Sequence, residues 1–185
     1  MKLGDYLANS ALRYPDRYAF ICGEDTRTFS QLDARATRIA NALTEHGLVH
    51  GDRIALHSPN CLEAVDVMCA AARAGAVVVP ISSRLSDAEV DYVLSDCTPR
   101  FLFVDSSLLR SDAAANSASG PTTFVLGDSD SERGLENLIA SGSDTPAESL
   151  PHDVEDLVLG YTSGTTGNPK GAVGTHAAMI ICSGY

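Results

Sequence analysis

Apolar residues along this chain recur with two alternating periods, that of a helix and that of a strand. A helix is expected from Ser30, where Ser30 and Asp33 resemble a capping box, to a glycine stop at Gly47. Its apolar positions share one face: Leu32, Ala36, Ile39, Ala40 and Leu43. Residues 53–58 then have the alternation of a strand. A helix followed by a strand is therefore the first predicted unit of the fold.

The middle of the chain continues this order with two elements that belong in a core. A nearly all-apolar helix is expected from a cap formed by Asn60 and Glu63 to Gly75, and a helix that is apolar on every side is buried. Residues 76–81 form a continuous, largely β-branched run, which is typical of a parallel strand covered on both faces.

The alternation persists beyond this strand and predicts the fold class. Ser86 with Glu89 opens another helix, and residues 101–104 and 122–126 are two more predicted strands. Strands that alternate with helices predict an α/β fold, in which a mainly parallel β-sheet is flanked by helices. Ligands of such sheets gather at the carboxyl ends of the strands. Two polar stretches are interpreted as surface loops, the second with a short helix at 135–140: residues 111–120 and 127–156.

The charge balance narrows the classes of partner. The 185 residues contain 13 Lys and Arg against 24 Asp and Glu, a net charge of −11. Residues 111–185 carry most of the surplus, with 2 basic and 10 acidic groups. An acidic chain disfavours binding of nucleic acid or of an anionic membrane through a basic face, so we expect no nucleic-acid partner.

Cysteine usage and hydropathy indicate a cytoplasmic protein. The five cysteines are an odd number without metal-type spacing, which favours free thiols in a reducing compartment. Residues 1–15 lack the apolar core of a signal peptide. The most apolar helix, at 64–72, is far too short to span a bilayer, so no transmembrane segment is expected.

One glycine-rich segment carries the candidate chemistry. Five glycines lie between Gly160 and Gly174, directly after an apolar run at 157–159. A strand that enters such a loop is a context in which phosphates are held, because glycines let backbone N–H groups approach an anion. Lys170, the only lysine besides Lys2, supplies a cation. Neutral donors are the hydroxyls of Thr162, Ser163, Thr165 and Thr166.

Other glycine motifs do not fit this segment. Pro169 occupies the position at which a Walker loop needs its second glycine, and neither G-x-G-x-x-G nor G-x-S-x-G is present in it. A surface loop that binds nothing is the alternative, and the number of constrained residue types beside Lys170 favours binding. Thr175 is a good helix cap, which places His176 in the first turn of a helix rather than in a catalytic role.

The segment YTSGTTGNPKG at 161–171 resembles the phosphate-binding signature of the AMP-forming adenylating enzymes, which include acyl-CoA synthetases, luciferases and peptide-synthetase adenylation domains. Residues 27–56, 72–97 and 171–176 are also similar to segments that these enzymes carry in this order. Within the family, residues 80–94 look more like the acyl-CoA synthetases. Gly174 departs from the pattern, since relatives commonly have a larger apolar residue there.

The resemblance implies a reaction and its cofactors. In that family ATP and Mg²⁺ bind to the large N-terminal domain, a carboxylic acid forms an acyl-adenylate with release of pyrophosphate, and coenzyme A (CoA) then takes the acyl group. Lys170 would act in catalysis, and the Thr165 hydroxyl is a candidate Mg²⁺ ligand. Carried over by position, the residues around the phosphates would be Thr162, Ser163, Gly164, Thr165, Thr166, Gly167 and Lys170.

The resemblance implies that the family's other functional segments lie beyond Tyr185. We therefore interpret residues 1–185 as an incomplete N-terminal, ATP-binding domain without the rest of that domain or the small lid domain. The chain alone is expected to be inactive. Two other hypotheses stay open: a non-catalytic nucleotide- or phosphate-binding module, or an inert interaction fragment. An adenylation domain of another subfamily and a homodimer also stay open.

Overall fold

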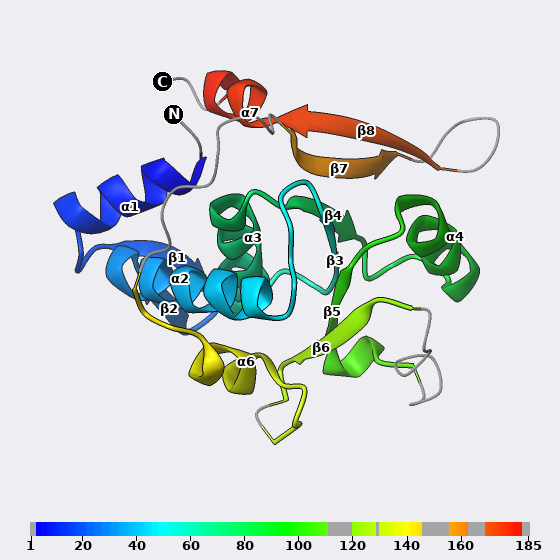
Figure 1. Ribbon diagram of the computed structural model, residues 1–185, viewed down its shortest axis with the longest axis horizontal. Helices are drawn as coiled ribbons and strands as arrows, with labels where there is room; N and C mark the ends of the chain where they lie inside the picture. Colours follow the sequence, from blue (N-terminus) through cyan, green and yellow to red (C-terminus); the bar gives the residue numbers. More distant parts are fainter. Residues whose placement is uncertain (1–2, 111–119, 129, 146–155, 163–168, 183–185) are drawn as a thin grey trace.

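A computed structural model describes residues 3–110, 120–128, 130–145, 156–162 and 169–182. Its centre is a six-stranded sheet with the strand order β6-β5-β3-β4-β7-β8. All neighbouring pairs of this sheet are parallel except β7 and β8, which pair antiparallel. The predicted α/β fold with a mainly parallel sheet flanked by helices is confirmed (Figure 1).

The elements alternate along the chain much as the sequence predicts. The helices are α1 (Leu3–Arg13), α2 (Phe29–Glu45), α3 (Leu62–Ala74), α4 (Asp87–Cys97), the 3₁₀ turn η1 (Ser106–Leu108), α6 (Leu135–Ser141) and α7 (His176–Cys182). The strands are β1 (Tyr18–Cys22), β2 (Asp25–Thr28), β3 (Arg53–His57), β4 (Val77–Ile81), β5 (Phe101–Asp105), β6 (Thr122–Leu126), β7 (Asp156–Thr162) and β8 (Lys170–Thr175).

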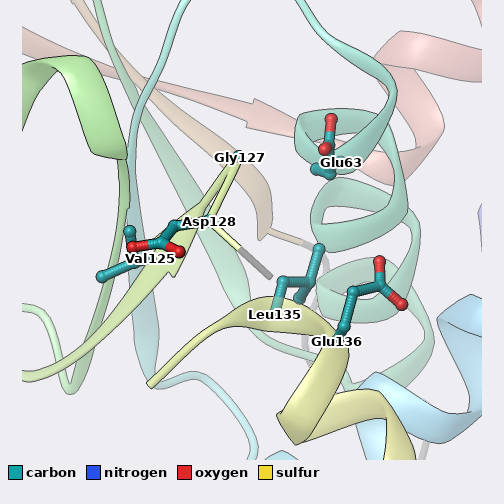
Figure 2. Close-up of a pocket in the computed structure, with 6 residues that line it drawn as sticks. All are labelled: Glu63, Val125, Gly127, Asp128, Leu135 and Glu136. Atoms are coloured by element: carbon teal, nitrogen blue, oxygen red, sulfur yellow. The ribbon is translucent and has the colours of Figure 1, made fainter. Parts of the chain in front are cut away.

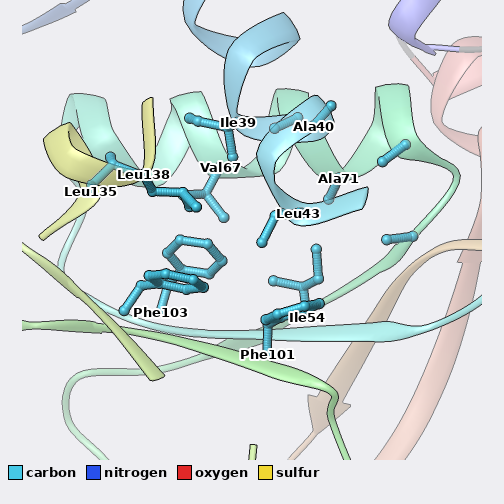
Figure 3. Close-up of a cluster of buried hydrophobic side chains, with 14 of the residues drawn as sticks. Ile39, Ala40, Leu43, Ile54, Val67, Ala71, Phe101, Phe103, Leu135 and Leu138 are labelled. Carbon is cyan, nitrogen blue, oxygen red and sulfur yellow. The ribbon is translucent and has the colours of Figure 1, made fainter. Parts of the chain in front are cut away.

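One face of the sheet is covered by α2, α3 and α6, which form the larger hydrophobic core with it (Figure 3). Phe101 and Phe103 of β5 are buried against this layer, and both rings stack on Phe124 of β6. The helices contribute aliphatic side chains, among them Ile39 of α2 and Val67 of α3, each fully buried. This packing explains why α3 is apolar on nearly every side: it lies between the sheet and the other helices.

The opposite face is covered by α4 and has a smaller core. Ala55 of β3 and Val79 of β4 point to this side and contact Val90 and Val93 of α4. Neighbouring residues on the same strands, such as Ile54, belong to the larger core. Strands covered on both faces have near-continuous apolar sequences, as residues 77–81 do.

Two predicted helix starts are wrong by one or two residues. Helix α2 begins after Thr28, whose Oγ1 accepts a hydrogen bond from Gln31 N at 3.2 Å while Gln31 Oε1 accepts one from Thr28 N at 3.0 Å. Thr28, and not Ser30, is therefore the N-cap residue of α2. Asp33 pairs with Arg73 of α3 instead of completing a cap. Helix α3 is capped by Cys61, not Asn60.

The third predicted cap and the glycine stop of α3 are confirmed. Ser86 N and Oγ donate hydrogen bonds to Glu89 Oε2 at 2.8 and 2.6 Å. Gly75 ends α3 with a φ of +68°, a left-handed conformation that favours glycine. None of the helices within the described ranges combines the length and the apolar character that crossing a membrane requires.

A buried ionic network connects α2, α3 and α6. Asp66 of α3 is fully buried. Its Oδ2 accepts a hydrogen bond of 2.6 Å from Arg35 Nε, and Arg27 Nη2 lies 3.5 Å from the same oxygen. Burial raises the pKa of Asp66, and the two guanidinium groups oppose that rise. Arg35 also donates to both carboxylate oxygens of Glu136, at 3.1 and 2.6 Å. Arg35 therefore joins a buried carboxylate to one at the surface.

The pair formed by Arg35 and Glu136 is expected to make stability depend on pH in the acid range. The hydrogen bonds from Arg35 hold the pKa of Glu136 below its ordinary value of 4.5. The stabilisation is therefore fully present above that pH and is lost as the pH falls through the lower folded-state pKa. We expect Glu136→Gln to weaken the acid dependence of urea unfolding midpoints, whereas Glu45→Gln, an exposed control, leaves it unchanged. Equal acid dependence of the unfolding midpoint in both variants would contradict the role given to the pair of Arg35 and Glu136.

Candidate phosphate-binding site

The glycine-rich segment connects two strands of one antiparallel hairpin. Strand β7 ends at Thr162 and β8 begins at Lys170, and these two residues face each other in the strand register. Thr162 Oγ1 lies 3.5 Å from the carbonyl oxygen of Lys170. The hairpin thus brings the first and last predicted phosphate-contacting residues together. The other predicted contacts lie outside the described residues: Ser163, Gly164, Thr165, Thr166 and Gly167.

The end of this hairpin at Thr162 and Lys170 lies at the edge of the sheet where ligands of α/β folds bind. Strand β7 runs parallel to β4, so Thr162 lies at the same edge as the carboxyl ends of β3, β4, β5 and β6. Figure 1 shows β7 and β8 side by side. Phosphate binding at this position stays a prediction.

Lys170 is the charged group of this site. Its side chain is exposed, and it takes part in none of the ion pairs formed within the described ranges. No carboxylate of the described residues pairs with this ammonium group, so it is available to an incoming anion. Together with the Thr162 hydroxyl it forms a donor set of cationic and neutral groups, which fits a phosphate.

Tyr161, the residue before Thr162, connects the hairpin to helix α4 through a hydrogen bond. Its hydroxyl donates a hydrogen bond of 2.5 Å to Asp96 Oδ2, near the end of α4. Burial and this hydrogen bond raise the pKa of the Tyr161 phenol, so the hydroxyl remains a donor throughout the neutral range. The sequence showed Tyr161 only as the first residue of the signature and gave no signal for Asp96.

Gly174 in β8 meets a close neighbour across the hairpin. A Cβ at this position would lie 2.7 Å from Val158 Cγ1 of β7. The departure from the family pattern therefore has a local reason, since a larger residue would collide with Val158 in this chain. Close approach is a common reason for glycine inside a strand.

Replacing Gly174 by alanine is expected to lower the free energy of unfolding by about 1–2 kcal/mol, because Val158 or the strand must shift. Gly160, in the same hairpin, is the matched control. Its added Cβ would have no neighbour closer than 4.0 Å, so Gly160→Ala is expected to change stability by about 0.5 kcal/mol or less. Urea unfolding of the two variants checks the difference, and equal losses would contradict it.

A separate pocket of about 230 Å³ opens at the carboxyl end of β6, and it does not suit a phosphate (Figure 2). Glu63 from α3 and Glu136 from α6 lie on one side of it in this view, and Asp128 lies on the other. Three carboxylates around a pocket repel an anion. Among the described residues, the lining is Glu63, Val125, Gly127, Asp128, Leu135 and Glu136.

The remaining candidate groups have structural roles or no chemical activation. His176 is buried in the first turn of α7, as predicted, and its Nδ1 accepts a hydrogen bond of 3.2 Å from Leu3 N. Burial raises the pKa of the thiols of Cys69 and Cys97 to about 12 and about 11, so neither is a ready nucleophile. Within the described ranges, no three His, Cys, Asp or Glu side chains are arranged to hold a metal ion.

Comparison with known proteins identifies the family. The sequence profile described as "AMP-binding enzyme" matches residues 7–184. The long-chain-fatty-acid–CoA ligase FadD13 of Mycobacterium tuberculosis is 39% identical over 156 residues, which cover 82% of this chain and 30% of that protein. Tyrocidine synthase 3 of Brevibacillus parabrevis is 34% identical over 177 residues, covering 95% of this chain and 2% of that protein. The chain belongs to the AMP-binding enzyme family.

Solved structures agree with this membership. The anthranilate CoA ligase AuaEII in complex with anthranoyl-AMP superposes with a TM-score of 0.83 and 27% identity over 95% of this chain and 35% of that chain. The inhibitor-bound N-terminal domain of FACL13 from Mycobacterium tuberculosis gives a TM-score of 0.79 and 34% identity, over 95% of this chain and 45% of that chain. This chain spans about a third of the length of the curated CoA ligases that it matches.

Proposed function

We propose that residues 1–185 are the N-terminal part of an AMP-forming carboxylate–CoA ligase and form an incomplete ATP-binding domain. The whole enzyme activates a fatty acid or another carboxylic acid with ATP and Mg²⁺, and then transfers the acyl group to CoA. The observation that carries this proposal is the hairpin that pairs Thr162 with Lys170 at the ligand-binding edge of the sheet. Relatives named as ligases of fatty acids and of 3-hydroxybenzoate support CoA as the acceptor.

In the first reaction a carboxylate oxygen attacks the α-phosphorus of ATP, and the bond to the bridging oxygen of pyrophosphate breaks. Negative charge then grows on the leaving pyrophosphate. The Lys170 ammonium group neutralises part of this charge, and the Thr162 hydroxyl donates to a phosphate oxygen. Main-chain N–H groups of Ser163, Gly164, Thr166 and Gly167 are our candidates for further contacts. The Thr165 hydroxyl is our candidate Mg²⁺ ligand.

The acidic composition gives Lys170 a larger role in this proposal. With a net charge of −11, the chain repels polyphosphates at long range, so attraction must be local. One lysine and a row of backbone N–H groups supply it. The five free cysteines of the chain agree with a cytoplasmic location, which is part of the proposal.

The test is product formation by the complete protein that contains this chain. Incubation with Mg-ATP, CoA and a panel of fatty and aromatic acids is expected to give AMP, pyrophosphate and one or more acyl-CoA products, detected by mass spectrometry. The 185-residue chain alone is expected to give none. Binding of Mg-ATP without any acyl-adenylate or acyl-CoA from the complete protein would favour a non-catalytic nucleotide-binding module instead.

A further inference from the structure

The end of β7 that leads into the signature segment lies beside β4 but has no registered backbone pair with it. β3 and β4 pair in register over five residue pairs, whereas β4 and β7 share the single pair of Val78 and Val158. On its other side β7 pairs only with β8, which is the edge strand of the sheet. From residue 159 to residue 162, the hairpin therefore extends without the continuous main-chain ladder that fixes the direction of a central strand.

Side chains of β7 provide the missing support, and they do so on the face covered by α4. Leu159 and Tyr161 alternate with Gly160, so both point to this face, and both pack against the smaller core. Apolar packing is not directional. The hydrogen bond of 2.5 Å from Tyr161 to Asp96 is directional, and it lies one residue before Thr162.

Asp96 is itself held by a well-anchored part of α4. Arg53 of β3 donates from Nε to the carbonyl oxygen of Cys97, and from Nη2 to Thr98 Oγ1 at 3.0 Å. The side chain of Cys97 is buried in the smaller core. A continuous set of contacts thus runs from the central strand β3, through the end of α4 and Asp96, to Tyr161 of the hairpin.

We propose that Asp96 and Tyr161 are positioning residues, whose hydrogen bond fixes the direction in which the hairpin presents Thr162 and Lys170 to the phosphates of ATP. This inference rests on the proposed function. A loop held in its binding orientation loses less conformational entropy when the ligand binds. Loss of the hydrogen bond between Tyr161 and Asp96 weakens binding of Mg-ATP, and it leaves the rate of the reaction in the bound complex nearly unchanged.

The test uses Tyr161→Phe in the complete ligase, with Tyr92→Phe as the matched control. Tyr92 lies on α4 and packs against the same core, and no hydrogen bond of its hydroxyl is found among the described residues. In ATP–pyrophosphate exchange, Tyr161→Phe is expected to raise the KM for Mg-ATP about three- to tenfold, with kcat changed less than about twofold. Tyr92→Phe is expected to change neither constant.

Two variants of the partner separate positioning from general packing. Asp96→Asn keeps an acceptor oxygen and is expected to retain a near-normal KM, whereas Asp96→Leu is expected to match Tyr161→Phe. The double variant Asp96→Leu with Tyr161→Phe should be no worse than either single variant, because one hydrogen bond is lost in each. Additive effects in the double variant would overturn the proposal.

Backbone hydrogen exchange supplies a readout that does not need activity. Amides of β7 and β8 are expected to exchange faster in Tyr161→Phe than in Tyr92→Phe, while the melting temperatures of both stay close to that of the parent protein. Equal KM values and equal exchange in the two tyrosine variants would refute the positioning role. An inactive parent protein would refute the proposed function instead, and the exchange comparison would still decide whether the hydrogen bond orders the hairpin.

Discussion

Replacing Lys170 by alanine in the complete ligase is expected to slow ATP–pyrophosphate exchange about 10²-fold. Removal of one preorganised donor to developing negative charge typically costs 10²- to 10³-fold in rate. The only other lysine of the chain is Lys2, and Lys170 forms no ion pair within the described ranges. Within residues 1–185, no neighbouring lysine is therefore available to replace its charge.

Arg13→Ala is the control for the loss of one positive charge. Arg13 lies in the last turn of α1, exposed and far along the chain from the signature segment. This variant is expected to keep the parent exchange rate. An unchanged rate in Lys170→Ala, measured at saturating ATP and acid, would show that Lys170 does not stabilise the leaving pyrophosphate.

Replacing Asp66 by alanine is expected to destabilise the domain by about 3–5 kcal/mol. The carboxylate is fully buried between Arg27 and Arg35, so its removal leaves two guanidinium groups facing a cavity without their counter-charge. Arg35 retains Glu136, a partner that is half exposed and less effective. The loss is measured as the change in the free energy of urea unfolding.

Asp144→Ala separates this effect from the loss of any ion pair. Asp144 is largely exposed and lies 3.5 Å from Arg38, so its removal is expected to cost less than about 1 kcal/mol. Equal losses in the two aspartate variants would show that the buried network contributes no more than a surface pair.

The order of the α-helices and strands from α2 to β6 could be predicted because each carries its own periodic pattern. The continuous apolar sequence of β4 and α3 reflects burial on both sides, which the structure confirms. Helix starts are harder to predict because a capping box is short: Thr28 with Gln31 fits the motif as well as Ser30 with Asp33. The patterns described above predict no element within residues 3–28, although α1 and the β1–β2 hairpin lie there.

The site was predictable only where its chemistry is local in sequence. Lys170 and Thr162 belong to one segment, and the hairpin register brings them together. The contact between Tyr161 and Asp96 joins residues 65 positions apart, and no periodic pattern relates them. The same holds for Asp66 and its partners, since a single acidic residue in an apolar helix shows burial but not which arginines approach it.

The most direct test of the proposed function is ATP–pyrophosphate exchange by the complete protein with labelled pyrophosphate and a panel of carboxylic acids. Exchange that requires Mg-ATP and at least one acid, without any need for CoA, is the expected result, because acyl-adenylate formation is reversible and precedes thiol transfer. No acid-dependent exchange across fatty and aromatic acids, from a folded protein that binds Mg-ATP, would contradict the assignment as a carboxylate-activating ligase.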